Sequence, residues 1–287
     1  MMFSFPIPVV SAPMIGPGSQ PLDDEQPLNT LSLPSDMHTF RPPIVELDSP
    51  PEVVAAAIGF LRHVLAGMEN TPYAAAEPLR FDLTHLEPPV RAEINDLLGE
   101  GEVAVLTDGE LRAQETAFTG MWRVFGEGHD LLEVVPFPIP IRERALARRM
   151  PEHALVPPDD AAGLMNAPPL VHEILQRAAA CKPGDAAYVI NLSLLPVTPE
   201  DTAWMDEVLG RGGVSVLSRG FGNCRITATA LPHVWWVQYF NNMEKLILNS
   251  IEIVDVPAVA LAAQEDYDET IVRLDEWIVS IESALDD

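Results

Sequence analysis

Two stretches of this chain resemble each other in register, 111 positions apart. Residues 93–106 read EINDLLGEGEVAVL, and residues 204–217 read WMDEVLGRGGVSVL. Three glycines recur at the same offset, so that Gly99, Gly101 and Gly109 match Gly210, Gly212 and Gly220. A segment that repeats itself in this way predicts one structural unit that is used twice.

Shorter matches extend the repeat on both sides and keep the same order. Residues 81–84 match 190–193, residues 122–124 match 235–237, and residues 133–138 match 252–257. The offset changes only where loops are predicted. The sequence therefore predicts an internal duplication.

Each copy is predicted to contain a helix, a short strand, a second helix and then several strands joined by tight turns. The helices are expected at 52–67, 88–98, 169–179 and 199–209, and the short strands at 79–83 and 187–192. The later strands of the second copy are expected at 214–217, 224–231, 235–240 and 246–254. The fold class is therefore α+β, with two tandem duplicated modules that are each a mainly antiparallel sheet with covering helices.

The rest of the chain is divided by composition. Ten of the 28 prolines lie within residues 1–50, which predicts a Pro-rich, acidic, extended N-terminal arm. The first module is assigned to 51–141, a linker to 142–168, and the second module to 169–287. The second module ends in a predicted helix at 258–285 with one apolar stripe and one acidic face.

A formal net charge of −26 limits the partners that this chain can bind. It disfavours nucleic acid and anionic membrane surfaces, and it favours cationic partners. The apolar start of the chain has no basic segment and is broken by prolines, and no uncharged apolar run is long enough to span a bilayer. Two cysteines, Cys181 and Cys224, form no disulfide framework. We expect a cytoplasmic protein that does not insert into a membrane.

Residues 219–241, RGFGNCRITATALPHVWWVQYFN, concentrate aromatic and cationic side chains. Tryptophan, tyrosine and arginine carry much of the binding energy at protein interfaces. The sequence therefore predicts a partner-binding site made of Arg219, Gly222, Asn223, Cys224, Arg225, Trp235, Trp236, Gln238 and Asn241. The alternative is that the aromatic strand at 235–240 packs in the core on both of its faces.

The residue spacing argues against catalytic, metal and cofactor sites. Cys224 and His233 would lie at opposite ends of one predicted strand, about 25 Å apart, which disfavours a nucleophile with its base. The seven histidines are scattered without the spacing of a metal site. The Gly-x-Gly at 99–101 follows a helix, as a C-terminal cap does. We expect no enzymatic activity and no cofactor.

Residues 220–229 and 235–241, together with other segments near both ends of the chain, resemble the HupH/HyaF family of hydrogenase expression and formation proteins. The resemblance is carried by residues 220–229 (GFGNCRITAT), 235–241 (WWVQYFN), 245–252 (KLILNSIE) and 254–266 (VDVPAVALAAQED), and near the start by 6–10, 16–21 and 39–43.

This resemblance implies a non-catalytic, cytoplasmic accessory protein in the maturation of uptake nickel–iron hydrogenases. Its implied partners are the iron–sulfur small-subunit precursor, before twin-arginine export, and other hydrogenase accessory proteins. It also implies a protective role when oxygen is present. The alternative is a metal or iron–sulfur scaffold that uses Cys224. No catalytic residues transfer from the family.

Comparison of the two copies reduces the predicted site to the residues that occur only in the second copy. At the 111-residue offset, the first copy has Asp108, Leu111, Arg112, Ala113 and Gln114 in place of Arg219, Gly222, Asn223, Cys224 and Arg225. Residues that occur in only one copy are free to serve function, whereas shared residues are expected to serve the fold.

Overall fold

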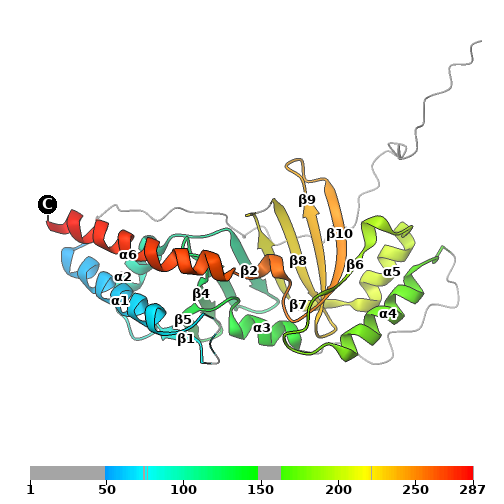
Figure 1. The fold of residues 1–287 in the computed structure, drawn as a ribbon, viewed down its shortest axis with the longest axis horizontal. Coiled ribbons are helices and arrows are strands. Elements are labelled where there is room, and N and C mark those ends of the chain that lie inside the picture. The colour runs from blue at the N-terminus through cyan, green and yellow to red at the C-terminus, as the bar shows by residue number, and fades with distance from the viewer. Residues whose placement is uncertain (1–48, 74, 76, 148–162, 221, 287) are drawn as a thin grey trace, which may run out of the picture. The chain divides into compact units, whose positions relative to one another are not determined.

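The structure is a computed structural model that describes residues 49–73, 75, 77–147, 163–220 and 222–286. These residues form an α+β fold with one antiparallel sheet (Figure 1). The helices are α1 (Pro51–Asn70), α2 (Pro88–Leu98), α3 (Ile139–Leu146), α4 (Ala167–Ala180), α5 (Pro199–Leu209) and α6 (Gln264–Asp286), with 3-10 turns η1 (Leu192–Leu194) and η2 (Ala258–Ala260). The strands are β1 (Leu79–Asp82), β2 (Val103–Thr107), β3 (Arg112–Glu115), β4 (Met121–Gly126), β5 (His129–Val134), β6 (Tyr188–Asn191), β7 (Arg211–Ser218), β8 (Asn223–Thr229), β9 (Val234–Phe240) and β10 (Leu246–Ile253).

The strand order of the sheet is β1-β5-β4-β3-β2-β7-β8-β9-β10-β6. The expectation of a separate sheet in each copy is thus corrected, because β2 pairs with β7 and joins the two halves. Val105 lies opposite Val216, and both side chains are buried. If β2 and β7 were edge strands, each would expose unpaired backbone groups and these apolar residues. Pairing the two strands forms the missing hydrogen bonds and buries the apolar side chains.

The two halves have the same order of elements. A helix, a strand, a helix and four strands form the first half from α1 to β5, and the same order runs from α4 to β10. The register of β2 and β7 is symmetrical about the Val105–Val216 pair, since Val103 faces Ser218 and Thr107 faces Val214.

Helices cover the two halves of the sheet separately. Side chains of α1 and α2 pack against Met121 and Leu132, and those of α4 and α5 pack against Trp236 and Ile251. A third core lies on the other side of the strands and includes residues of both halves. Its members include Val105, Trp122, Val124, Ile141, Val216, Ile226, Trp235, Val237 and Val256. Neighbouring residues of one strand thus enter different cores, as the alternation of a strand requires.

The C-terminal helix was assigned to the second module, but it packs against the first half. Leu274, Ile278 and Ile281 of α6 belong to the core of α1 and α2, and Figure 1 shows α6 running alongside α1. Arg62 of α1 pairs with Asp275 and Glu282 of α6, at 2.7 Å each. The helix predicted at 258–285 begins only at Gln264, and Leu261, the first residue expected in its stripe, lies before it and is 40% exposed. The rest of the apolar stripe is confirmed, but its partner in the fold lies about 200 residues earlier in the chain.

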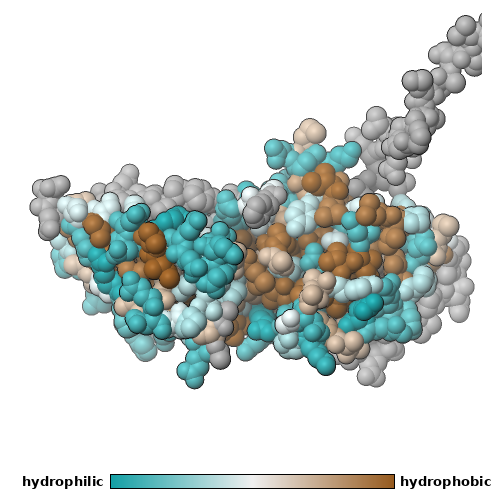
Figure 2. Space-filling model, viewed as in Figure 1, coloured by the Kyte–Doolittle hydropathy of each residue, from teal (hydrophilic) through white to brown (hydrophobic). Residues whose placement is uncertain are grey.

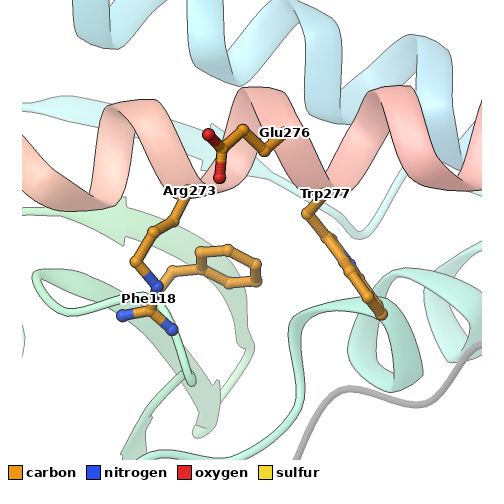
Figure 3. A pocket seen from close by; sticks show the side chains of 4 residues that line it. All are labelled: Phe118, Arg273, Glu276 and Trp277. Atoms are coloured by element: carbon orange, nitrogen blue, oxygen red, sulfur yellow. The ribbon is translucent and has the colours of Figure 1, made fainter.

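A surface pocket of about 270 Å³ lies where α6 meets the loop between β3 and β4. Figure 3 shows the four side chains that line it. Arg273 lies 5.7 Å from the ring centre of Phe118 and donates to the Ala117 carbonyl at 3.3 Å. The indole of Trp277 donates to the carbonyl of Leu97 at 2.9 Å. These side chains already have partners within the protein, so they join α6 to the first half.

Among the described residues, α1 is the one helix whose length and composition would allow it to cross a membrane. Its buried side chains, among them Val54, Leu61 and Met68, belong to the core shared with α2 and α6. This is the packing of a core helix.

Two predicted segments lie largely outside the described residues. Of the arm at 1–50, only Ser49 and Pro50 are described. The linker assigned to 142–168 begins within α3 and ends within α4, and its residues 148–162 are outside the described ranges.

Glu115 in β3 gives the stability of the first half a dependence on pH. Burial raises the pKa of this carboxyl to about 7 from 4.5, although the amide of Gly120 donates to it at 3.1 Å. A raised pKa in the folded state means that stability is full below about pH 4.5 and falls as the pH rises through 7, by about 3 kcal/mol in total. Glu115→Gln is therefore expected to stabilise the protein more at pH 8 than at pH 5, as measured by urea unfolding. The exposed Glu69→Gln serves as control, and an equal effect of Glu115→Gln at both pH values would contradict the prediction.

Candidate partner-binding site

The predicted site residues lie on β8, β9 and the turns beside them. Arg219 follows β7, and Gly222 has a φ of 99° just before β8 begins at Asn223. Asn223 is paired with Phe240, so the turn before β8 and the turn after β9 lie at the same end of the sheet. Asn241 belongs to that second turn, where its side-chain oxygen accepts hydrogen bonds from the amides of Met243 and Lys245, at 2.9 Å each.

The two adjacent tryptophans are buried on opposite faces of β9. Trp235 is 1% exposed, and its indole donates to the carbonyls of Val254 and Asp255, at 3.2 Å each. Trp236 is 5% exposed, and its indole donates to Oδ1 of Asn249 at 2.6 Å. Their polar atoms are satisfied within the protein, so both indoles serve the core. A role for these two tryptophans in binding a partner stays a prediction.

Cys224 is also a core residue. It is 1% exposed and lies opposite Tyr239, and burial raises the pKa of its thiol to about 12. Nucleophilic attack and metal ligation both need the thiolate, which this environment disfavours. His233 lies in the turn between β8 and β9, with Nδ1 3.0 Å from Oδ1 of Asp255. Cys181 packs with the α4 and α5 core, on the other side of the sheet from Cys224.

The part of the chain that the structure describes contains no group of three or more His, Cys, Asp or Glu side chains placed to hold a metal ion. Cys224 belongs to the central core, and its cross-strand neighbours are Ser218 of β7 and Tyr239 of β9.

Arg225 and Gln238 lie on the same face as Trp236, on paired positions of β8 and β9. The guanidinium of Arg225 lies 4.4 Å from the ring centre of Phe240, and its Nε is buried without a hydrogen-bond partner. Gln238 is buried, with its Oε1 also unpaired. Each of these two side chains thus holds one buried polar atom that has no hydrogen-bond partner among the described residues.

The predicted residues that reach solvent are at the turns. Arg219 and Gly222 are exposed, and Asn223, Arg225 and Asn241 are half-buried. Two apolar residues beside them were missed: Met243 is 82% exposed and Ile247 is 60% exposed. The signal that would have found Met243 is an apolar residue inside a turn. Figure 2 shows apolar side chains gathered over the part of the molecule where Figure 1 places β6 to β10.

We use the name hairpin end for Arg219, Gly222, Asn223, Asn241, Met243 and Ile247, which lie at or beside the two turns. It combines exposed apolar side chains with a cation and turn amides. An exposed apolar group of this kind, rimmed by polar residues, is typical of a protein-binding surface.

Comparison with known proteins shows which family this chain resembles. Residues 164–281 match the family model described as HupH hydrogenase expression protein, C-terminal conserved region. The chain is 43% identical over 284 residues to the hydrogenase expression/formation protein HupH of Rhodobacter capsulatus, covering 98% of this chain and 100% of the relative. It is 35% identical over 275 residues to the hydrogenase-1 operon protein HyaF of Escherichia coli, covering 92% and 94%.

A solved structure of the hydrogenase expression protein HupH from Thiobacillus denitrificans is 31% identical, with a TM-score of 0.39. The match covers 41% of this chain and 98% of that one. The similarity to the two relatives extends over nearly their whole length, and the range matched by the family model contains the positions of the hairpin end. This chain therefore belongs to the HupH/HyaF family of hydrogenase expression and formation proteins.

Proposed function

We propose that this protein is a non-catalytic accessory factor that binds the iron–sulfur small-subunit precursor of an uptake nickel–iron hydrogenase in the cytoplasm, before twin-arginine export. The observation that carries the proposal is the similarity, over nearly the full length, to proteins named for hydrogenase expression and formation. Other hydrogenase accessory proteins are further proposed partners, and shielding of the bound precursor is the proposed protection when oxygen is present.

The binding surface in this proposal is the hairpin end, together with the half-buried Arg225. Trp235, Trp236, Gln238 and Cys224 lie beneath it and hold β8 and β9 in place. The apolar side chains of Met243 and Ile247 supply contact area, and Arg219 supplies a polar anchor. The charge of −26 favours encounter with a precursor that carries a basic leader.

We also propose that the two halves arose by internal duplication. Equivalent hydrogen bonds in the two halves support this proposal. The indole of Trp122 donates to the Val135 carbonyl at 3.1 Å, and the indole of Trp235 donates to the Val254 carbonyl in the same way. Gly99 and Gly210 end their helices with φ of 60° and 63°. In this reading the shared residues build the scaffold, and the hairpin end belongs to the second copy alone.

The test is co-purification of the small-subunit precursor with the tagged full-length protein from cells that make immature hydrogenase. Met243→Ser/Ile247→Ser is expected to reduce the recovered precursor about tenfold, because it removes exposed apolar contact area. Arg219→Ala is expected to act in the same direction. Recovery is also expected to fall with rising salt concentration, because the long-range attraction is screened.

The matched control is Val272→Ser/Val279→Ser, which makes the same kind of change at exposed apolar positions of α6. It is expected to leave recovery unchanged. A wild-type protein that retains none of the precursor would contradict the proposed function. If both double variants lowered the recovery of the precursor equally, the hairpin end would not be the binding surface.

A further inference from the structure

Each half of the sheet carries one row of four side chains across neighbouring strands. The rows lie on the side away from α1, α2, α4 and α5, because each contains a tryptophan of the shared core. In the first half the row is Glu115, Trp122, Glu133 and Arg80, and in the second half it is Ala228, Trp235, Glu252 and Val189.

In the first row, Glu133 is a fully buried carboxylate with two partners. Arg80, on the outer strand β1, forms an ion pair with a guanidinium nitrogen 2.6 Å from Oε1, although this contact does not have the geometry of a hydrogen bond. The amide of Ile139, at the start of α3, donates to Oε2 at 3.0 Å. The charge is thus paired, as a buried carboxylate requires.

In the second row, Glu252 occupies the corresponding place without these partners. It lies between Trp235 and Val189 in the register, as Glu133 lies between Trp122 and Arg80. Valine cannot pair with a carboxylate, and within the described ranges no hydrogen bond or ion pair to the Glu252 carboxylate exists.

The surroundings of Glu252 make this lack of a partner costly. The side chain is half-buried, and burial raises its pKa above the usual range. It lies on the same face as Trp235, Val237 and Ser250, all of which are buried. A half-buried carboxylate gains from a cation that can share its partly desolvated environment.

The outer side of this row is accessible. Val189 is 53% exposed, and its strand β6 is the last strand of the sheet formed by the described residues. A segment from another protein can therefore approach Glu252 past Val189, from the direction that Arg80 takes in the first half.

We propose that Glu252 is the receptor for an arginine side chain of a partner polypeptide, which takes the place that Arg80 takes beside Glu133. Arginine fits because its planar guanidinium pairs with a carboxylate through two parallel hydrogen bonds and loses less hydration than an ammonium group does. This inference rests on the proposed function, in which the partner is the small-subunit precursor.

The ability of Glu252 to pair with an arginine is tested first in the absence of any partner protein. Val189→Arg in the full-length protein supplies from within the chain the arginine that Arg80 supplies in the first half. Its thermal midpoint is expected to exceed that of Val189→Gln, a neutral side chain of similar reach. This difference is expected to disappear when both variants also carry Glu252→Gln. A difference that persists without Glu252, or no difference at all, would overturn the proposal.

Binding of the precursor is then measured with the wild type and the same variants. Glu252→Gln and Val189→Arg are each expected to weaken binding about ten- to one-hundred-fold, whereas Val189→Gln changes it far less. Replacing the precursor's arginines singly by lysine is expected to reveal one whose loss weakens binding to the wild type but not to Glu252→Gln.

The outcomes separate the two proposals. If the wild type binds the precursor and Glu252→Gln binds it equally well, the arginine receptor is wrong and the proposed function stands. If the wild type does not bind the precursor at all, the proposed function fails and the inference fails with it.

Discussion

Replacing Trp235 by alanine is expected to lower the free energy of unfolding by about 3 to 5 kcal/mol. The indole is almost completely buried in the core shared by both halves, and it donates to two backbone carbonyls. Truncation leaves a cavity that the sheet cannot close, since Val237 and Ile226 are held by their own strands. Denaturant unfolding of the full-length protein measures this loss.

Two further variants separate packing from other effects. Trp122→Ala, at the corresponding place in the first half, is expected to cost a similar amount. The exposed Val279→Ala is expected to change stability by less than about 0.5 kcal/mol. A Trp235→Ala protein as stable as the wild type would contradict the burial of this side chain. Because Trp235→Ala is expected to be destabilised, weaker partner binding by this variant would report unfolding rather than a lost contact.

Replacing Gly212 by alanine is expected to cost about 3 kcal/mol. An added Cβ would lie 2.3 Å from the carbonyl oxygen of Thr229 and 2.8 Å from that of Ala228, so the backbone of β8 would have to move. The corresponding Gly101 meets the carbonyl oxygen of Thr116 at the same 2.3 Å. Alanine at either position is therefore expected to lower the thermal midpoint by a similar amount.

Gly59 in α1 provides the matched control, because an added Cβ there meets no atom within 4 Å. Gly59→Ala is expected to stabilise the protein by about 0.5 to 1 kcal/mol, since alanine favours a helix interior. A neutral effect of Gly212→Ala would show that the strands can separate without cost, contrary to the close approach seen here.

Local elements were predicted well from sequence. The helices α2 and α5 were expected at the bounds that the structure has, because each begins with a proline and ends before a glycine. The strand β9 was expected one residue short of its observed start, because its length and flanking turns are local features. The short turn between β9 and β10 was also placed correctly.

The candidate site was predicted less well, for a physical reason. The sequence shows that Trp235 and Trp236 are adjacent aromatic residues, which must lie on opposite faces of a strand. It does not show that both faces are covered, which depends on α4, α5 and the segment around Val256. Exposure is a property of the assembled layers, so the exposure of Ile247 at the start of β10 became visible only in the structure.

The sequence by itself determined the positions of helices such as α2 and α5, the similarity of positions 111 apart, and the family. These depend on local periodicity, on glycine and proline, and on direct similarity. Tertiary structure alone decided that β2 pairs with β7 in one sheet, that α6 packs on α1, and that Glu252 lacks the partner that Glu133 has. Each of these depends on contacts between residues far apart in the chain, and an apolar stripe or a lone carboxylate does not specify which distant residue it will meet.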